Sequence, residues 1–382
     1  MAGSRYGWPQ VFALLLLGAF VLEALWVIDR TPLRRSEVAW AQAGLDQLRG
    51  NILPRDLGTQ PVPAAIAAAP ILLAGEMVRS LSPYGLKWLA RLPFVGIGWL
   101  LGASIWYVAR RLYGNAGGYI ALTLYCFSPA VFFSSPGPLL TGSLGIFGTI
   151  FVAIAAAHTL YAPREAAIYE LRSRWRRIIL LGVAIALATG SGWWAIMLIA
   201  LGLGFMLYLI PERRLASLGL VLASCAVAVV LLLASYGFRP RALVSAVSRA
   251  SFVSHRGIAS EVQRAYVTGI RHAENPALLV GAALALVAYF AWKRCRYFGN
   301  TAPLLSLVVL TALGLVSFAD VFVGPFPFRA APFLYVFVGG VFADLLESRR
   351  RNLFGILLVG LLAVYAMGTL AAVVRLPSSA LP

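Results

Sequence analysis

Long apolar runs, separated by short polar turns, dominate the hydropathy pattern of the chain. The clear runs cover residues 9–29, 91–109, 116–133, 141–161, 216–236, 276–292, 301–319, 331–346 and 353–374. About 20 apolar residues in a helix cross the hydrocarbon core of a bilayer. Only helices and closed barrels satisfy the backbone there, and unbroken apolar runs of this length indicate helices. The pattern therefore predicts a bundle of membrane-spanning helices.

The run 178–210 is too long for one span, and TGSGWW at Thr189–Trp194 interrupts it. Glycine and serine favour a break in a helix, and paired tryptophans are typical of the membrane interface. We expect two spans that meet at an outer turn. The predicted fold class is all-α, a polytopic membrane protein of about 11 transmembrane helices, with 1–382 as a single membrane domain.

The apolar segment Pro61–Val78 decides the orientation of the chain. It contains three prolines and Glu76. If it does not span, five short turns share one side, and together they hold fifteen Lys and Arg. These turns are 110–115, 162–177, 211–215, 293–300 and 347–352. Basic short turns face the cytoplasm, so we expect an interfacial helix at 62–78, a cytoplasmic N-terminus and an outer C-terminus.

Two long outer loops follow from this topology, at 30–90 with amphipathic helices and at 237–275. The outer segments hold as many Lys and Arg in total as the inner ones, so the orientation rests on the short turns alone.

Composition agrees with the hydropathy pattern. Hydrophobic residues make up 60% of the chain and charged residues 12%, with a mean hydropathy of +0.83. Soluble domains carry about 25% charged residues. The net charge of +18 lies in turns and loops, where it suits membrane lipids better than nucleic acid. Cys126, Cys225 and Cys295 lack metal-ligand spacing, so no metal site is predicted.

An ordered series of motifs follows the first span. They are SEVAWAQAGLDQLRGN (Ser36–Asn51), TQPVPAAIAA (Thr59–Ala68), Arg-Leu-Pro (Arg91–Pro93), RRLYG (Arg110–Gly114) and Ser-Pro (Ser128–Pro129). In this order they resemble motifs of the membrane-embedded C-type glycosyltransferases, in particular the protein mannosyltransferase and aminoarabinose transferase branch. The resemblance covers about residues 10–210, and FPFRAAPFLYVFVGG (Phe326–Gly340) adds a less specific match.

The resemblance implies transfer of a sugar from a polyprenyl-phosphate carrier at the outer face of a bacterial inner membrane. This chemistry needs a carboxylate base and cations that hold the leaving phosphate. The family typically has Asp-Glu at the start of its first outer helix, and this chain has Ser36 and Glu37. Glu37 is therefore the predicted catalytic residue. It could instead be a helix-start charge favoured by the helix dipole.

Other positions depart from the family pattern. Gly142 stands where a second aspartate commonly occurs, and ATGSGW (Ala188–Trp193) lacks the lysine of a TKG-like turn. These departures favour an alternative, a catalytically inactive relative that serves as a structural subunit with protein partners. A transporter is a weaker third hypothesis, since Glu23 in the first span is the nearest to an ion-coupling carboxyl.

The outer loops supply the candidates for binding the substrate and the lipid phosphate, because arginine and histidine suit phosphate. The set includes Asp56 as a substitute for the missing aspartate, and its members are Arg34, Arg35, Arg55, Asp56, His255, Arg256, Arg264, Arg271, His272 and Arg329. Contacts with lipid headgroups or water are the plainer interpretation of each. The sequence requires no cofactor, although a divalent metal ion is compatible with this chemistry.

Overall fold

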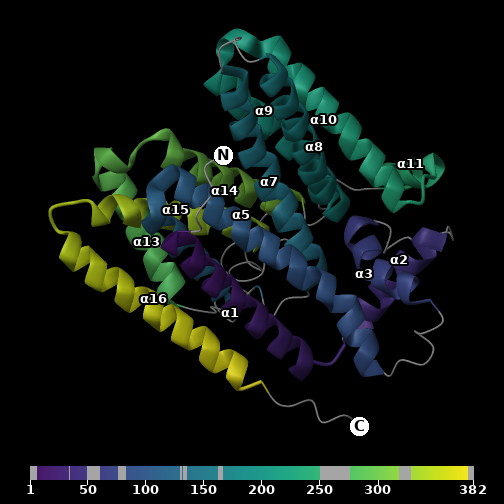
Figure 1. The fold of residues 1–382 in the computed structure, drawn as a ribbon, viewed down its shortest axis with the longest axis horizontal. Helices are drawn as coiled ribbons and strands as arrows, with labels where there is room; N and C mark the ends of the chain where they lie inside the picture. The colour runs from purple at the N-terminus through teal and green to yellow at the C-terminus, as the bar shows by residue number, and fades with distance from the viewer. Residues whose placement is uncertain are drawn as a thin grey trace. The chain divides into compact units, whose positions relative to one another are not determined.

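The computed structural model describes residues 7–33, 35–49, 61–75, 83–129, 131, 136–161, 167–249, 276–317 and 328–376. The regular elements in these ranges are all helices (Figure 1). The predicted all-α fold class is thus confirmed.

The chain divides into two compact units, each built from separate stretches of sequence, and each is described by itself. The first unit comprises residues 1–32, 98–134 and 255–382. Its helices are α1 (Trp8–Arg30), the part of α5 (Pro83–Cys126) from Gly98, α13 (Pro276–Ala291), η4 (Lys293–Cys295), α14 (Phe298–Ser317), η6 (Phe328–Ala330), α15 (Ala331–Leu346) and α16 (Arg351–Val374).

The second unit comprises residues 33–97 and 135–254. Besides the start of α5, its helices are α2 (Arg35–Arg49), α3 (Pro61–Ala74), α7 (Pro136–Tyr161), α8 (Ala167–Ser191), η2 (Trp193–Ile196), α9 (Met197–Leu209), η3 (Pro211–Arg213), α10 (Arg214–Ser235) and α11 (Pro240–Arg249).

Five described helices are long and apolar enough to cross a membrane. They cover Trp8–Arg30, Tyr84–Cys126, Leu139–His158, Pro211–Ser235 and Arg351–Val374. Shorter apolar helices cover Pro61–Ala74, Trp193–Leu209, Pro276–Ala291, Phe298–Leu313 and Ala331–Leu346. Each predicted span coincides at least in part with a described helix, as a polytopic membrane protein requires.

Two glycines lie where the helices break between predicted spans. Gly114 has φ 75° and ψ −170°, so α5 kinks between the spans predicted at 91–109 and 116–133. Only glycine adopts a positive φ without a steric penalty from Cβ. Gly192 interrupts the long run 178–210, and η2 and α9 follow it. The predicted break at TGSGWW is therefore confirmed.

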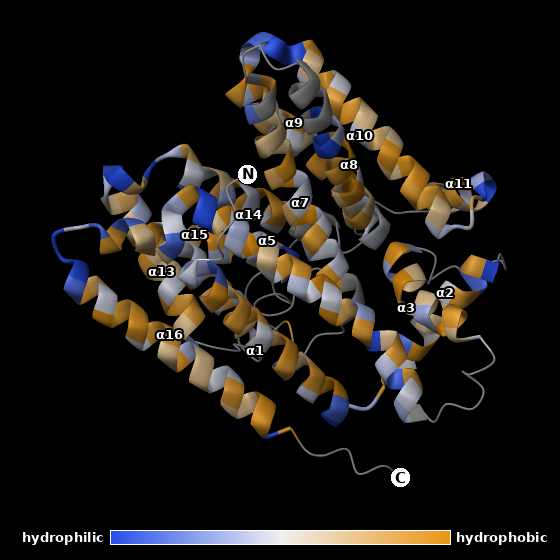
Figure 2. Ribbon diagram, viewed as in Figure 1, coloured by the Kyte–Doolittle hydropathy of each residue, from blue (hydrophilic) through white to orange (hydrophobic). Residues whose placement is uncertain are grey.

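Helix α15 is the centre of the first unit, and fourteen of its sixteen residues are buried. Gly339 lets it approach α5 closely, because a Cβ there would lie 2.8 Å from the Gly117 carbonyl oxygen. By contrast, α16 keeps large apolar side chains exposed along its length, which Figure 2 shows as a mostly orange helix. Such an all-apolar exposed surface suits contact with lipid.

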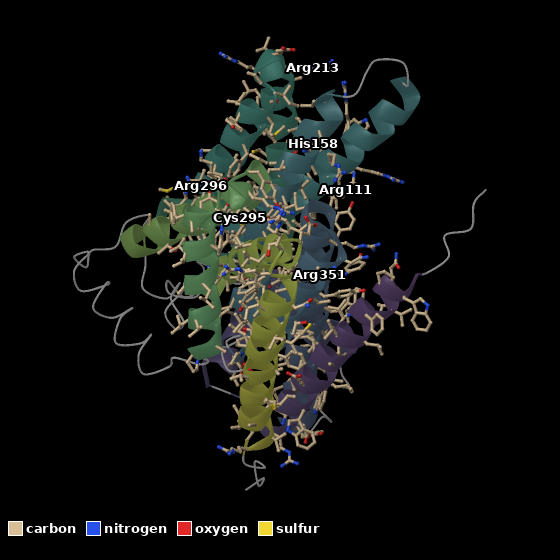
Figure 3. All side chains as sticks on the ribbon, turned by 90° about the vertical axis from the view of Figure 1, so that its left-hand side faces the viewer. Arg111, His158, Arg213, Cys295, Arg296 and Arg351 are labelled. Atoms are coloured by element: carbon tan, nitrogen blue, oxygen red, sulfur yellow. The ribbon has the colours of Figure 1, made fainter. Side chains whose placement is uncertain are left out.

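Three polar turns of the first unit are joined to one another. The Tyr113 hydroxyl donates to the Gly299 carbonyl oxygen at 2.6 Å, and the Asn300 Nδ2 donates to Asp344 Oδ2 at 2.8 Å. Arg111, Arg296 and Arg351 come from these turns or their neighbouring helix ends (Figure 3). The grouping of the five basic turns on one side of the membrane, and the cytoplasmic location of that side, stay predictions.

Candidate functional site

Helix α2 presents Glu37 in its first turn. A carboxylate is favoured there because the backbone N–H groups at a helix N-terminus carry partial positive charge. The Glu37 side chain is only 13% exposed. Glu37, the predicted catalytic residue, is therefore largely buried by the fold and is not a freely solvated charge.

The start of α5 supplies two cations beside α2. Lys87 and Arg91 are four residues apart, so they lie on the same face of the helix. Both are buried, at 6% and 5% exposure. The Lys87 Nζ also lies 4.9 Å from the centroid of the Tyr84 ring, where the ring face attracts a cation. This face of α5 therefore carries two positive charges that are buried from solvent.

Arg91 and Glu37 form a two-point ion pair. The Arg91 Nη2 donates to Glu37 Oε2 at 2.6 Å, and the Arg91 Nε donates to Oε1 at 3.3 Å. The planar guanidinium matches a carboxylate in this fork geometry and fixes its orientation. Both carboxylate oxygens are engaged, so the arrangement suits an orienting role for Glu37. Its role as a base stays a prediction.

Small and apolar residues hold α2 at this place. Ala41, Ile71 and Ala90, one each from α2, α3 and α5, form a buried apolar cluster. A Cβ on Gly44 would lie 2.0 Å from the Ala64 carbonyl oxygen, so only glycine permits the observed approach of α2 to α3. The helix that carries Glu37 is therefore closely packed against α3 and α5.

Gln47 ties α2 to two other elements of the second unit. Its Nε2 donates to the Pro61 carbonyl oxygen at 3.2 Å and to the Ser235 carbonyl oxygen at 2.5 Å. Gln47 is 3% exposed, so these bonds form away from water and contribute more than surface bonds do. Through Gln47, the start of α3 and the end of α10 position the helix that carries Glu37.

Most of the predicted phosphate-binding side chains lie outside the described residues. They are Arg34, Arg35, Arg55, Asp56, His255, Arg256, Arg264, Arg271 and His272, of which Arg35 has only its helical backbone described. Arg329 is described in η6 of the first unit and is 4% exposed. It is thus a buried cation and not one at an exposed headgroup position.

The described donors do not by themselves fit a divalent metal ion. Among the residues that the structure describes, no three His, Cys, Asp or Glu side chains gather as a metal site would need. Glu37 is engaged by Arg91, and hard divalent cations require several oxygen ligands.

The sequence patterns missed Lys87 as a site residue, and Arg91 entered only as the first residue of the Arg-Leu-Pro motif. A usable signal exists in LKWLARLPF (Leu86–Phe94), where two charges stand four apart in an otherwise apolar stretch. Charged residues in such stretches face the interior of the bundle and pair with other polar groups. The spacing therefore predicts a shared polar face, but not the partner.

Comparison with known proteins bears on the fold. No protein-family model and no curated protein matches the chain. Among solved structures, the chain is similar to the oligosaccharyltransferase of Archaeoglobus fulgidus in its apo form, with a TM-score of 0.55 and 11% sequence identity. The match covers 98% of this chain and 56% of that chain, so this chain spans little more than half of that protein's length.

At 11% identity the likeness shows the fold and not the activity. The matching protein is an oligosaccharyltransferase, and the all-α fold that the sequence predicts agrees with the match. The chain thus has an oligosaccharyltransferase-like fold and a buried ion pair of Glu37 with Arg91, with the buried Lys87 one turn away on the same face of α5.

Proposed function

We propose that this protein is a membrane glycosyltransferase-like protein that transfers a sugar from a polyprenyl-phosphate carrier to an acceptor at the outer face of the membrane. The observation that carries the proposal is the buried ion pair of Glu37 with Arg91, with the buried Lys87 one turn away on the same face of α5, in a chain with this fold. The motif series between Ser36 and Pro129 supports it independently of the structure.

The proposed reaction breaks the bond between the anomeric carbon and the phosphate oxygen of the carrier. A new bond forms between that carbon and a nucleophilic atom of the acceptor, whose proton passes to a carboxylate. The phosphate leaves with the electron pair and gains negative charge. Cations already in place stabilise this charge without reorganisation, which is the main source of catalysis in such sites.

Lys87 is the residue that we assign to the leaving phosphate. Its ammonium is a compact charge on a flexible stem, so it can follow the phosphate as the bond breaks. Arg91 is a positioning residue in this proposal, since its fork holds Glu37 in one orientation. Glu37 then accepts the acceptor's proton or orients the acceptor, with Asp56 as a substitute base.

The alternative function is a catalytically inactive scaffold in a membrane complex. The two-point pairing of Glu37 favours it, because a carboxylate whose oxygens are both engaged is a poor general base. A scaffold should co-purify with other chains in a fixed ratio after mild extraction, whereas a free-standing enzyme should purify alone.

Transfer from a synthetic polyprenyl-phosphate sugar, measured by mass spectrometry of the released lipid phosphate, tests the proposal. Glu37→Gln keeps the shape of the side chain and should lower transfer at least about tenfold. Glu347→Gln is the matched control, since Glu347 forms an exposed ion pair with Arg294 in the first unit. Transfer that survives Glu37→Gln as well as it survives Glu347→Gln would remove Glu37 from the mechanism.

The proposal also assigns the protein to a bacterial inner membrane, with a cytoplasmic N-terminus, an outer C-terminus and contacts with membrane lipids. The basic short turns support this orientation. Labelling of cysteines introduced at Arg349 and at Gln42 with an impermeant reagent tests it, since only the second should react in intact cells.

A further inference from the structure

The first spanning helix carries a carboxyl group inside its apolar length. Helix α1 buries Leu17, Phe20 and Val27 on one face, and Glu23 lies on that same face. Glu23 is 8% exposed, so more than nine-tenths of it is removed from the surface. The glycosyltransferase proposal makes no use of this residue, which belongs to the first unit.

Aromatic residues and glycines of α5 form the surface against which this face of α1 packs. The rings of Phe20 and Tyr125 lie 5.4 Å apart. A Cβ on Gly98 would lie 2.7 Å from the Phe20 ring, and one on Gly102 would lie 2.8 Å from Leu17. The two helices are therefore in close contact one turn from Glu23 (Figure 1).

Three tyrosine hydroxyl groups of α5, α15 and α16 bond to partners other than Glu23. The Tyr125 hydroxyl donates to the Gly98 carbonyl oxygen at 2.7 Å, and the Tyr335 hydroxyl donates to Ser128 Oγ at 2.8 Å. The Tyr365 hydroxyl donates to the Leu124 carbonyl oxygen at 3.0 Å. These three hydroxyl groups are thus engaged with other groups.

Glu23 itself has no such partner in the described part of the chain. Its Oε2 is buried without a hydrogen bond, and no ion pair involves the residue there. The described titratable group that interacts with Glu23 is the Cys126 thiol of α5. Beside Cys126, the Tyr125 ring lies 6.4 Å from the Tyr335 ring of α15, and the Tyr365 hydroxyl of α16 donates to the Leu124 carbonyl oxygen. All of these groups are uncharged when protonated, and none supplies a positive charge.

An ionised carboxylate in this setting would lack both solvent and a counter-charge. Burial of an isolated charge costs several kcal/mol or more, and proteins avoid this cost by neutralising the group. The carboxylic acid form has no such penalty. Glu37 differs, because Arg91 provides its counter-charge.

We propose that Glu23 is a proton-binding site inside the membrane part of the first unit, and that the packing of α1 against α5 depends on the bound proton. The ligand of the site is a single proton. Removal of the proton places an uncompensated charge at the contact between α1 and α5 and loosens it.

The pH dependence of stability provides the deciding test. In the unfolded chain a glutamate releases its proton near pH 4.3, whereas the proposal requires the folded chain to keep it at higher pH. The unfolded state then binds fewer protons, so stability falls as pH rises above that value. Thermal unfolding of the full chain in detergent, from about pH 5 to about pH 9, should show a steeper loss for the wild type than for Glu23→Gln.

Labelling with dicyclohexylcarbodiimide provides a second readout. This apolar reagent takes up the proton and adds to a protonated carboxyl, and the adduct rearranges to an N-acylurea that retains every atom of both reactants. Mass spectrometry should find it at Glu23, with a rate that falls about tenfold for each pH unit once the acid ionises. Glu37 serves as the control, since its ion pair should leave it unlabelled.

If the unfolding temperature depends on pH equally steeply for the wild type and for Glu23→Gln, the proposal is overturned, whatever result the labelling gives. A steeper wild-type slope supports it, and labelling at Glu23 that declines with pH supports it further. If Glu23→Gln does not fold, Glu23→Leu replaces it, because leucine fills a similar volume and does not titrate.

Discussion

Glu37 and Glu23 are both largely buried carboxyl groups on helices, one in each unit, and they differ in what lies beside them. The Glu37 Oε2 accepts a hydrogen bond from Arg91 Nη2 at 2.6 Å, whereas Glu23 forms no hydrogen bond among the described residues. Burial alone therefore does not decide the state of a carboxyl group. The neighbouring groups decide as well. A nearby cation favours the ionised form of a buried carboxyl, and the absence of a cation favours the neutral acid.

Loss of Arg91 should have the largest effect. Arg91→Met leaves the Glu37 carboxylate in a half-enclosed site without its counter-charge, which costs about 3–5 kcal/mol when one partner of a buried ion pair is removed. Thermal unfolding in detergent measures this destabilisation. The double variant Glu37→Gln with Arg91→Met should recover much of the loss, and additive effects of the two changes would contradict the pairing.

Glycine positions sharpen the comparison of the two units. Gly44→Ala forces a Cβ to within 2.0 Å of the Ala64 backbone and should cost about 1–3 kcal/mol by overpacking. Gly18→Ala in α1 meets nothing within 4 Å and should be neutral or stabilise by up to about 1 kcal/mol. Equal unfolding temperatures for the two variants would show that the close approach of α2 to α3 is not required.

Replacement of Glu23 by an apolar residue should act in the opposite direction to loss of Arg91. Glu23→Leu removes a buried oxygen that has no hydrogen bond, so stability at neutral pH should rise by about 1 kcal/mol. The gain should grow at alkaline pH, where the wild-type carboxyl ionises. A loss of stability on this change, measured by the same thermal unfolding, would mean that Glu23 has a stabilising partner.

The exposed ion pair of Arg294 with Glu347 should show the smallest effect. Its side chains are 54% and 70% exposed, and solvent screens such pairs so that they contribute about 0–1 kcal/mol. Arg294→Gln should therefore leave unfolding nearly unchanged, and more so in high salt. A loss as large as that of Arg91→Met would mean that burial does not distinguish the two pairs.

The sequence predicted the helices well and the site only in part. Apolar runs specify spans because length and hydropathy are local properties, and Gly114 permits the kink in α5 because its φ is positive. Gly192 lies at the second break with an extended φ, which other residues also adopt. The partner of Glu37 lies 54 residues further along the chain, at Arg91, and no local pattern encodes such a contact. The apolar Val38 of α2 is 46% exposed, while the polar Gln47 is buried. Packing of α2 against α3 and α5 decides both outcomes.

The most direct test of the proposed function is the binding of a polyprenyl monophosphate to the purified protein by native mass spectrometry. The wild type should retain the lipid through gentle extraction. Lys87→Met should weaken binding at least about tenfold, because it removes a charge-assisted contact to phosphate. Lys293→Met, which removes an exposed lysine of the first unit, should bind as the wild type does. No binding by the wild type, or equal binding by Lys87→Met and Lys293→Met, would contradict the carrier site that we propose.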